Sequence, residues 1–200
     1  MQASSTKISD TASHDAGLKD QHFMEQALRL ALRVQGMTGS NPAVGCVIVS
    51  ADGAVVGTGW TQSGGRPHAE TEALGEAGNA ARGGTAYVTL EPCAHTGKTA
   101  PCADALVAAG LKSVFFALYD PDPRVAGRGA EKLRQAGIEV HEGLMRDAAH
   151  DVNAGFLSRV SGGRPHVTLK LAVSKNGFMR TPDGEPPWIC LLYTSDAADD

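Results

Sequence analysis

The sequence predicts an α/β protein in which helices cover both faces of one sheet. Three observations support this prediction. Short apolar runs with strand character alternate with segments of helical periodicity. The chain is 42% hydrophobic and holds 24 glycines, which is typical of a globular α/β protein. Its 200 residues suit one domain of ordinary size and part of a second.

The first elements along the chain are a leader, a helix and a pair of strands. Residues 1–20 are polar and lack the apolar core of a signal peptide, so we expect a flexible leader. Residues 22–35 should form a helix, because apolar side chains recur there at helical spacing. Strands over 44–49 and 55–60 should form a hairpin, because Asp52-Gly53 supplies the backbone that a tight turn needs.

The middle of the chain continues this alternation. A loop ending at Pro67 leads into a helix over 68–78, and further helices are expected over 103–109 and 126–136. The intervening strands are expected over residues 85–90, 114–118 and 138–141. Strands that alternate with helices in this way favour a layered sheet.

The last part of the chain begins a second unit. A helix over 144–159 precedes a turn-rich boundary at 162–165, and a strand is expected over 167–173. The few residues that follow are too short to bury a core of their own. Residues 191–200 continue no pattern and resemble a non-native tail, so we exclude them from the fold.

Charge and composition exclude several classes of protein. The net charge of −4 gives no basic face for nucleic acid, and no apolar run is long enough to span a membrane. Four cysteines in a chain without a secretion signal indicate metal ligands or inert thiols rather than disulfides. We therefore predict a cytoplasmic protein.

The main chemical signal is His68-Ala69-Glu70 together with Cys93 and Cys102. One imidazole and two thiolates are one ligand short of a closed zinc site, and a catalytic zinc keeps the fourth position for water. Glu70 lies two residues after His68, where it can exchange protons with that water without binding the metal. His-x-Glu followed by Pro-Cys and a second Cys is typical of zinc deaminases.

Two alternatives compete with a catalytic zinc site. His68 could be a loop histidine and the cysteines core residues, which is the commoner case for each residue alone but not for the whole pattern. The site could also be structural, with His95 as a fourth ligand, and Glu70 would then have no role.

The spacing of the thiols resembles a known family. The run from Cys93 to Cys102 reads Cys-Ala-His-Thr-Gly-Lys-Thr-Ala-Pro-Cys, and the segments 41–45 and 120–129 carry further family motifs. Over residues 21–188 the chain resembles the bacterial bifunctional riboflavin-biosynthesis deaminase/reductase. The resemblance implies a cytidine-deaminase-like three-layer α/β/α sandwich with a mixed sheet and a bound Zn²⁺. It also implies hydrolytic deamination of 2,5-diamino-6-ribosylamino-4(3H)-pyrimidinone 5′-phosphate.

The resemblance further implies which residues contact this phosphorylated pyrimidine: Asn41, His95, Lys98, Asp120 and Asp122. Among them Lys98 and His95 could meet the 5′-phosphate, because a cation offsets its charge. The chain departs from the family at Thr61, where histidine is usual, and at Asp122, where asparagine is usual. Both departures concern substrate contacts rather than the zinc chemistry.

Residues 164–174 and 184–189 resemble the start of the family's second domain, which is similar to dihydrofolate reductase. By that resemblance Ala172 and Trp188 would contact NADPH. We expect no reductase activity from these residues alone, although a full-length parent should have it. The predicted organisation is a leader, a deaminase domain, a linker helix with hinge, a truncated reductase start and a tail, over residues 1–20, 21–145, 146–163, 164–190 and 191–200.

Two other functions stay open at this point. One is another nucleobase or tRNA adenosine deaminase, against which the long cysteine spacing and the acidic balance speak. The other is a zinc-stabilised module without catalysis. The expected partner is a small molecule rather than nucleic acid or a membrane, and a homo-oligomer is compatible with the sequence.

Overall fold

The computed structural model describes residues 6–95, 100–122, 126–173, 175 and 177, with backbone alone for residues 6–16. The chain divides into two compact units, Met1–His166 and Val167–Asp200. Every helix and strand of the described residues lies in the first unit. The predictions for Lys98, Trp188 and the tail over 191–200 concern positions outside the described residues.

One mixed sheet forms the centre of the first unit, with strand order β2-β1-β3-β4-β5. Strand β1 pairs antiparallel with β2 and β3, whereas β3, β4 and β5 run parallel to one another. The five strands confirm those expected from the sequence: β1 (Gly45–Val49), β2 (Val55–Trp60), β3 (Thr85–Val88), β4 (Ser113–Phe116) and β5 (Glu139–Glu142).

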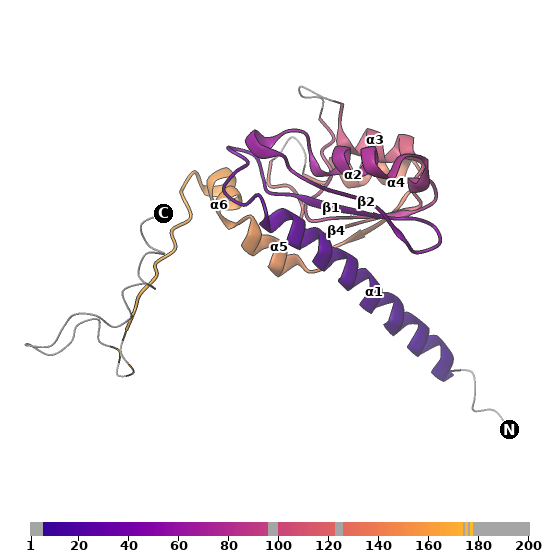
Figure 1. Ribbon diagram of the computed structural model, residues 1–200, viewed down its shortest axis with the longest axis horizontal. Coiled ribbons are helices and arrows are strands. Elements are labelled where there is room, and N and C mark those ends of the chain that lie inside the picture. The colour runs from indigo at the N-terminus through magenta and orange to yellow at the C-terminus, as the bar shows by residue number, and fades with distance from the viewer. Residues whose placement is uncertain (1–5, 96–99, 123–125, 174, 176, 178–200) are drawn as a thin grey trace, which may run out of the picture. The chain divides into compact units, whose positions relative to one another are not determined.

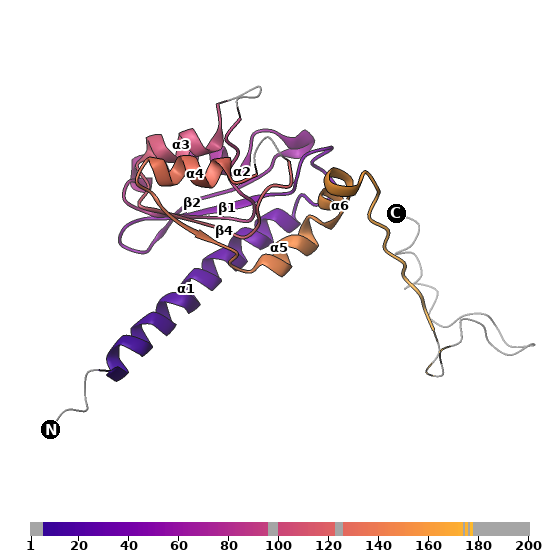
Figure 2. The same cartoon turned by 180° about the vertical axis from the view of Figure 1, so that it is seen from behind.

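Helices cover both faces of this sheet, as the sequence predicts. Helices α2, α3 and α4 lie on one face and α1 and α5 on the other (Figures 1 and 2). The helix bounds are as follows: α1 (Thr6–Leu32), α2 (Ala69–Ala77), α3 (Cys102–Ala109), α4 (Arg128–Gln135), α5 (Arg146–Val152) and α6 (Ala154–Gly162). No described helix has both the length and the apolar character needed to cross a membrane.

Glycines in β1 and β2 let helices lie directly against the strands. A Cβ at Gly45 would lie 1.9 Å from the carbonyl oxygen of Ala27 in α1. On the other face, a Cβ at Gly57 would lie 2.2 Å from the carbonyl oxygen of Ala73 in α2. Because a side chain at either position would overlap helix backbone, these glycines set how closely both helices approach the sheet.

The first helix is longer than predicted, because it begins at Thr6, within the segment predicted as a leader, rather than at residue 22. The flexibility expected of residues 1–20 stays a prediction. Helix α1 is anchored by its buried C-terminal half, which includes Met24 and Ala31. A helix that is already nucleated extends at little cost, because each further residue adds one hydrogen bond.

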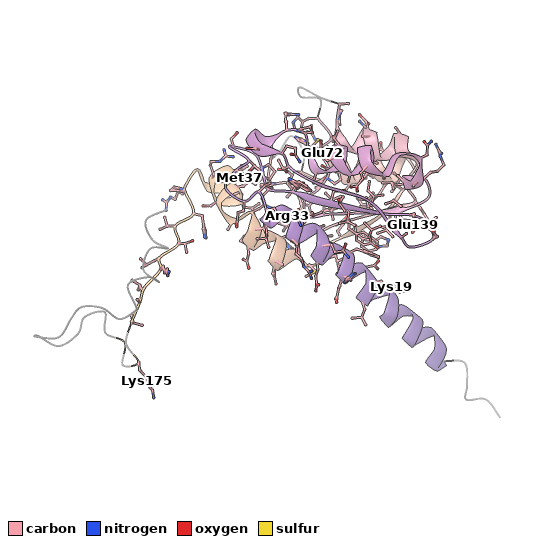
Figure 3. All side chains as sticks on the ribbon, viewed as in Figure 1. Lys19, Arg33, Met37, Glu72, Glu139 and Lys175 are labelled. Atoms are coloured by element: carbon pink, nitrogen blue, oxygen red, sulfur yellow. The ribbon has the colours of Figure 1, made fainter. Side chains whose placement is uncertain are left out.

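Just after the C-terminal end of α1, Arg33, labelled in Figure 3, lies over the Trp60 ring, 5.6 Å from the centroid.

The single helix expected over 144–159 is two helices, α5 and α6, separated at Asn153. The Asn153 side chain accepts a hydrogen bond from the Ala43 amide at 2.9 Å and donates one to the Ala43 carbonyl at 3.0 Å. These bonds hold Asn153 in a non-helical conformation with φ −107°. A break in the helix at this asparagine therefore anchors α6 to the loop before β1.

The strand expected over 167–173 is wrong for the described residues, since none of them belongs to a strand. The side chains of Val167 and Leu169 are 80% and 76% exposed. A strand pattern specifies a strand only where a partner supplies the ladder of hydrogen bonds. The described part of this second unit supplies none.

Candidate metal centre and active site

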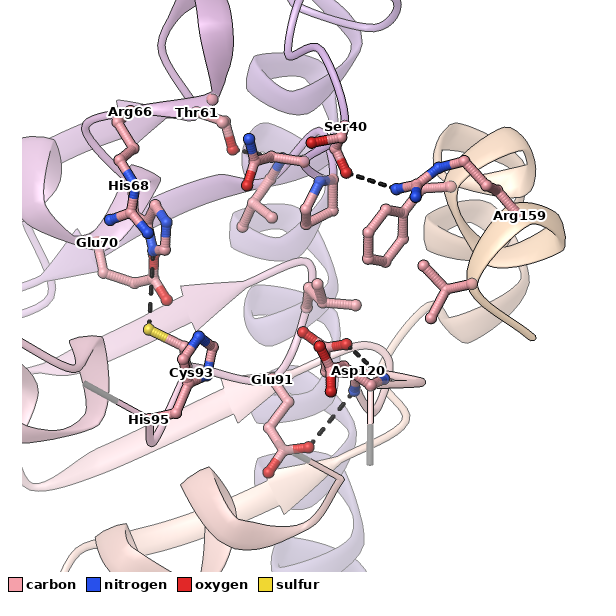
Figure 4. A pocket seen from close by; sticks show the side chains of 18 residues that line it. Ser40, Thr61, Arg66, His68, Glu70, Glu91, Cys93, His95, Asp120 and Arg159 are labelled. Atoms are coloured by element: carbon pink, nitrogen blue, oxygen red, sulfur yellow. Dashed lines mark hydrogen bonds between the residues drawn. The ribbon is translucent and has the colours of Figure 1, made fainter. Parts of the chain in front are cut away.

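Two helix starts and one loop bring His68, Cys93 and Cys102 together. His68 directly precedes α2, Cys93 follows the segment after β3, and Cys102 is the first residue of α3. The three ligand atoms lie within 4.8 Å of one another. The His68 Nδ1 atom is 3.3 Å from Cys102 Sγ and 3.7 Å from Cys93 Sγ, and Figure 4 shows the latter contact.

These distances fit a zinc ion. Zinc–sulfur and zinc–nitrogen bonds of about 2.3 and 2.0 Å at tetrahedral angles place nitrogen and sulfur about 3.5 Å apart. His68 satisfies this separation toward both thiols. His95 is not part of the group, so among the described residues the structure gives no support to a closed site with four protein ligands. The predicted ligand set of one imidazole and two thiols is confirmed as a possible metal site.

The pKa values of the two thiols are shifted in opposite directions. A hydrogen bond with Cys102 is the largest influence lowering the pKa of Cys93, which falls to about 4. The same hydrogen bond and burial raise the pKa of Cys102. The Cys102 amide also donates to Cys93 Sγ at 3.3 Å. A thiolate is the form that binds metal, so Cys93 is ready to act as a ligand at neutral pH.

Glu70 lies in the first turn of α2 and is only 4% exposed. Burial raises its pKa to about 7, and the negative charge of Cys93 adds to the effect. Glu70 does not belong to the ligand group. A carboxyl group with a pKa near neutrality, beside a metal site but outside it, is suited to accept and return a proton.

A pocket of about 300 Å³ opens over this centre, a volume within the usual range for small ligands. The structure brings four of the five predicted substrate contacts into its lining: Asn41, His95, Asp120 and Asp122. His95 Nδ1 is buried without a hydrogen-bond partner among the described residues, and it is therefore a candidate to bind a ligand. Ala172, the described NADPH candidate, is an exposed residue of the second unit.

Glu91 also lines the pocket, although its place in the sequence predicts no role of its own. It is 3% exposed, and its carboxylate accepts hydrogen bonds from three backbone amides at the start of α4 and from one in the loop after β4. The donors and distances are Gly127 at 2.9 Å, Gly129 at 2.9 Å, Ala130 at 3.1 Å and Asp120 at 3.4 Å. The signal in the sequence that could have indicated its role is the position of this acid, directly after the strand expected over 85–90.

Thr61, the first departure from the family pattern, has a structural partner. It is 2% exposed, and its Oγ1 accepts a hydrogen bond from the Val44 amide at 3.0 Å. Thr61 also lines the pocket. The hydroxyl therefore satisfies a backbone amide next to β1 while its residue forms part of the pocket wall.

The outer side of the pocket comes from α6, which the sequence predicts only as part of a linker helix. Phe156, Arg159 and Val160 contribute to the lining. Figure 4 shows Arg159 across the pocket from His68 and Glu70. No local motif marks these residues, because they reach the site only through the fold.

Residues 18–118 match the family model described as the cytidine and deoxycytidylate deaminase zinc-binding region. The riboflavin biosynthesis protein RibD of Escherichia coli K12 is 51% identical over 172 residues, covering 86% of this chain and 47% of that protein. RibD of Aquifex aeolicus is 46% identical over 170 residues, covering 85% of this chain and 48% of that protein. The chain spans about half the length of the curated relatives it matches.

Solved structures give the same result for the fold. RibD of Acinetobacter baumannii superposes with a TM-score of 0.78 at 48% identity, covering 91% of this chain and 51% of that one. A diaminohydroxyphosphoribosylaminopyrimidine deaminase/5-amino-6-(5-phosphoribosylamino)uracil reductase of Thermotoga maritima gives 0.81 at 37% identity, covering 92% and 53%. The predicted cytidine-deaminase-like sandwich is confirmed.

Proposed function

The chain belongs to the cytidine and deoxycytidylate deaminase family of zinc-binding domains, and on that premise we propose that it is the deaminase part of a riboflavin-biosynthesis deaminase/reductase. The reaction is hydrolysis of 2,5-diamino-6-ribosylamino-4(3H)-pyrimidinone 5′-phosphate to 5-amino-6-(5-phosphoribosylamino)uracil and ammonia. The observation that carries the proposal is the buried carboxyl of Glu70 beside the His68–Cys93–Cys102 group.

His68, Cys93 and Cys102 would hold zinc, which supplies a Lewis acid and lowers the pKa of water to about 7. Glu70 accepts a proton from the attacking water and donates it to the ring nitrogen. The water oxygen bonds to the ring carbon that bears the exocyclic amine. Glu70 then takes the second proton from that oxygen and gives it to the amine, so that the carbon–amine bond breaks, ammonia leaves and a ring carbonyl forms. One carboxyl group serves all these steps, because it alternates between base and acid.

The remaining lining residues orient the substrate. His95 Nδ1 is a buried polar atom without a protein partner among the described residues, so it is available to the pyrimidine or its phosphate. Asn41 and Asp120 offer an amide and a carboxylate for the base and ribose. Asp122 and Lys98 complete the contacts that the family resemblance implies, and Lys98 lies outside the described residues.

The test is ammonia release by Glu70→Gln, with the zinc content measured on the same sample. Glutamine keeps the shape but cannot alternate between base and acid, so we expect turnover to fall at least about a thousandfold while one zinc per chain is retained. Glu72→Gln, two residues along the same helix, is the matched control and should keep its activity. Full activity in Glu70→Gln would overturn the mechanism.

The same assay separates the rival substrates. We expect the wild-type chain to release ammonia from the diaminopyrimidinone ribotide but not from cytidine, adenosine or tRNA. Turnover of any of these three alone would assign the chain to another deaminase. Zinc binding without turnover of any substrate would favour a zinc-stabilised module.

Four further predictions stay proposals. They are NADPH-dependent reduction by a longer parent only, a cytoplasmic location, no binding to nucleic acid, and the division into domains with its boundary near residue 163. The described part of the second unit presents exposed apolar residues, including Leu171. We expect these residues to be covered by further reductase sequence in the parent.

A further inference from the structure

The pocket has a wall that lies outside the part of the chain matched by the deaminase family model. That match ends at residue 118, whereas Phe156, Arg159 and Val160 of α6 line the same pocket as Glu70 and Cys93. The α6 wall, as we call these three residues, is fixed to the rest of the first unit by two links. One is the pair of hydrogen bonds between Asn153 and Ala43, and the other is made by Arg159 itself.

Arg159 is held in place by neutral groups. Its Nη2 donates a hydrogen bond to the Ser40 carbonyl oxygen at 2.6 Å, and its guanidinium carbon lies 5.7 Å from the centroid of the Phe156 ring. Among the described residues no carboxylate forms an ion pair with it. Its charge is therefore positioned but not neutralised, and most of its five N–H donors stay available.

Two arginines line the pocket: Arg66 lies beside His68 at the inner end, and Arg159 lies at the α6 wall (Figure 4). Glu70, Asp120 and Asp122 also line the pocket, and each carboxylate would repel a phosphate placed beside it. Figure 4 shows Arg159 across the pocket from Glu70, so a ligand whose base reaches Glu70 can extend its far end toward the guanidinium. A guanidinium can donate two parallel hydrogen bonds to two phosphate oxygens. The bond to the Ser40 carbonyl uses only Nη2 of Arg159, so the other N–H groups can still do this.

We propose that Arg159 is the anion-binding residue of this pocket and that it holds the 5′-phosphate of the pyrimidine ribotide. This proposal rests on the proposed function for the identity of the substrate, but its geometry concerns the α6 wall alone. It makes α6 a selectivity element for phosphorylated over unphosphorylated substrates, in addition to any contribution from Lys98.

The first test compares kcat/KM for the ribotide and for the same compound without its phosphate. We expect Arg159→Gln to lower the ratio of the two values about tenfold, mainly through KM of the ribotide, because a charge-assisted hydrogen bond is lost. Arg159→Lys keeps the charge without the fork and should lose less. Arg146→Gln, an exposed arginine in the first turn of α5, is the matched control and should leave the ratio unchanged.

The second test needs no turnover. Broadening of the ³¹P resonance of ribose 5-phosphate should appear with the wild type and Arg146→Gln, weaken with Arg159→Lys and disappear with Arg159→Gln. Zinc content and thermal unfolding of each variant check that it is folded. If Arg159→Gln does not fold, the comparison of Arg159→Lys with the wild type carries the test.

The outcomes separate the two proposals. Binding of ribose 5-phosphate that depends on Arg159, without deamination of any pyrimidine, would support the subsite and overturn the proposed function. Deamination with an unchanged substrate ratio in Arg159→Gln, together with unchanged broadening, would overturn the subsite and leave the function standing. Loss of the ratio in Lys98→Gln but not in Arg159→Gln would assign the phosphate to Lys98 instead.

Discussion

The inner end of the pocket, at His68 and Glu70, and its outer end, at Arg159, differ in how far apart along the chain their parts lie. His68 and Cys102 are 34 residues apart, whereas Arg159 and its partner Ser40 are 119 apart. The chemical groups of the inner end sit at the starts of two helices packed on the sheet. The residues proposed for the chemistry are therefore concentrated in the segment from His68 to Cys102. The residue proposed for selectivity comes from α6, a helix distant in sequence that the fold places beside this segment.

Removing one ligand should break the inner end and have the largest effect. We expect Cys102→Ser to lose most of its zinc and at least about a thousandfold of its activity, because a hydroxyl is a poor ligand for zinc beside one thiolate and one imidazole. Metal content and ammonia release measure both effects. Cys46→Ala, which removes a buried thiol outside the ligand group, should keep its zinc. Zinc loss of equal size in both variants would contradict the assigned ligands.

Changing Glu91 should disturb the loop that carries Asp120, which lines the pocket only as part of its wall, and have an intermediate effect. Glu91→Gln replaces one carboxylate oxygen by an NH₂ group that faces backbone N–H donors, so the loop carrying Asp120 loses its acceptor. We expect the free energy of unfolding to fall by about 2 kcal/mol. KM should rise about tenfold because Asp120 shifts. Denaturant unfolding and steady-state kinetics measure the two effects, and an unchanged KM would show that the loop does not depend on Glu91.

Loosening the outer end alone should have the smallest effect. Asn153→Ala removes both hydrogen bonds to Ala43, and we expect it to cost about 1–2 kcal/mol of unfolding free energy. Zinc content should stay at the wild-type value, since none of the three proposed ligands lies in α6. The expected kinetic change is a rise in KM of a few fold with kcat nearly unchanged. A fall in zinc content would show that the two ends are not independent.

The sequence predicted the parts whose physics is local. His68, Cys93 and Cys102 could be grouped because metal ligands recur at characteristic spacings, and the order of strands and helices followed from apolar periodicity. The roles of Glu91 and Arg159 could not be predicted. Their partners, which are the backbone amides at the start of α4 for Glu91 and the carbonyl of Ser40 for Arg159, reach them only through tertiary structure. The catalytic role of Glu70 stays a prediction until its variant is assayed.

The errors also have physical causes. Helix α1 begins earlier in the chain than predicted, because extension of a nucleated helix needs no apolar face. The helix break at Asn153 depends on hydrogen bonds to a residue 110 positions earlier. The segment over 167–173 has strand composition without a partner strand, which composition cannot reveal.

The glycine contacts of β1 and β2 bear on how the molecule moves. At Gly45 and Gly57 a helix backbone rests against the strand with no side chain between them. Layers in such close contact cannot slide over one another without colliding, so α1, the two strands and α2 should move as one rigid block. Motion that admits or releases a ligand should then come from lining segments outside this block, and α6 is one of them. Entry and exit rates should accordingly depend on α6, while the block that carries His68 and Glu70 stays still.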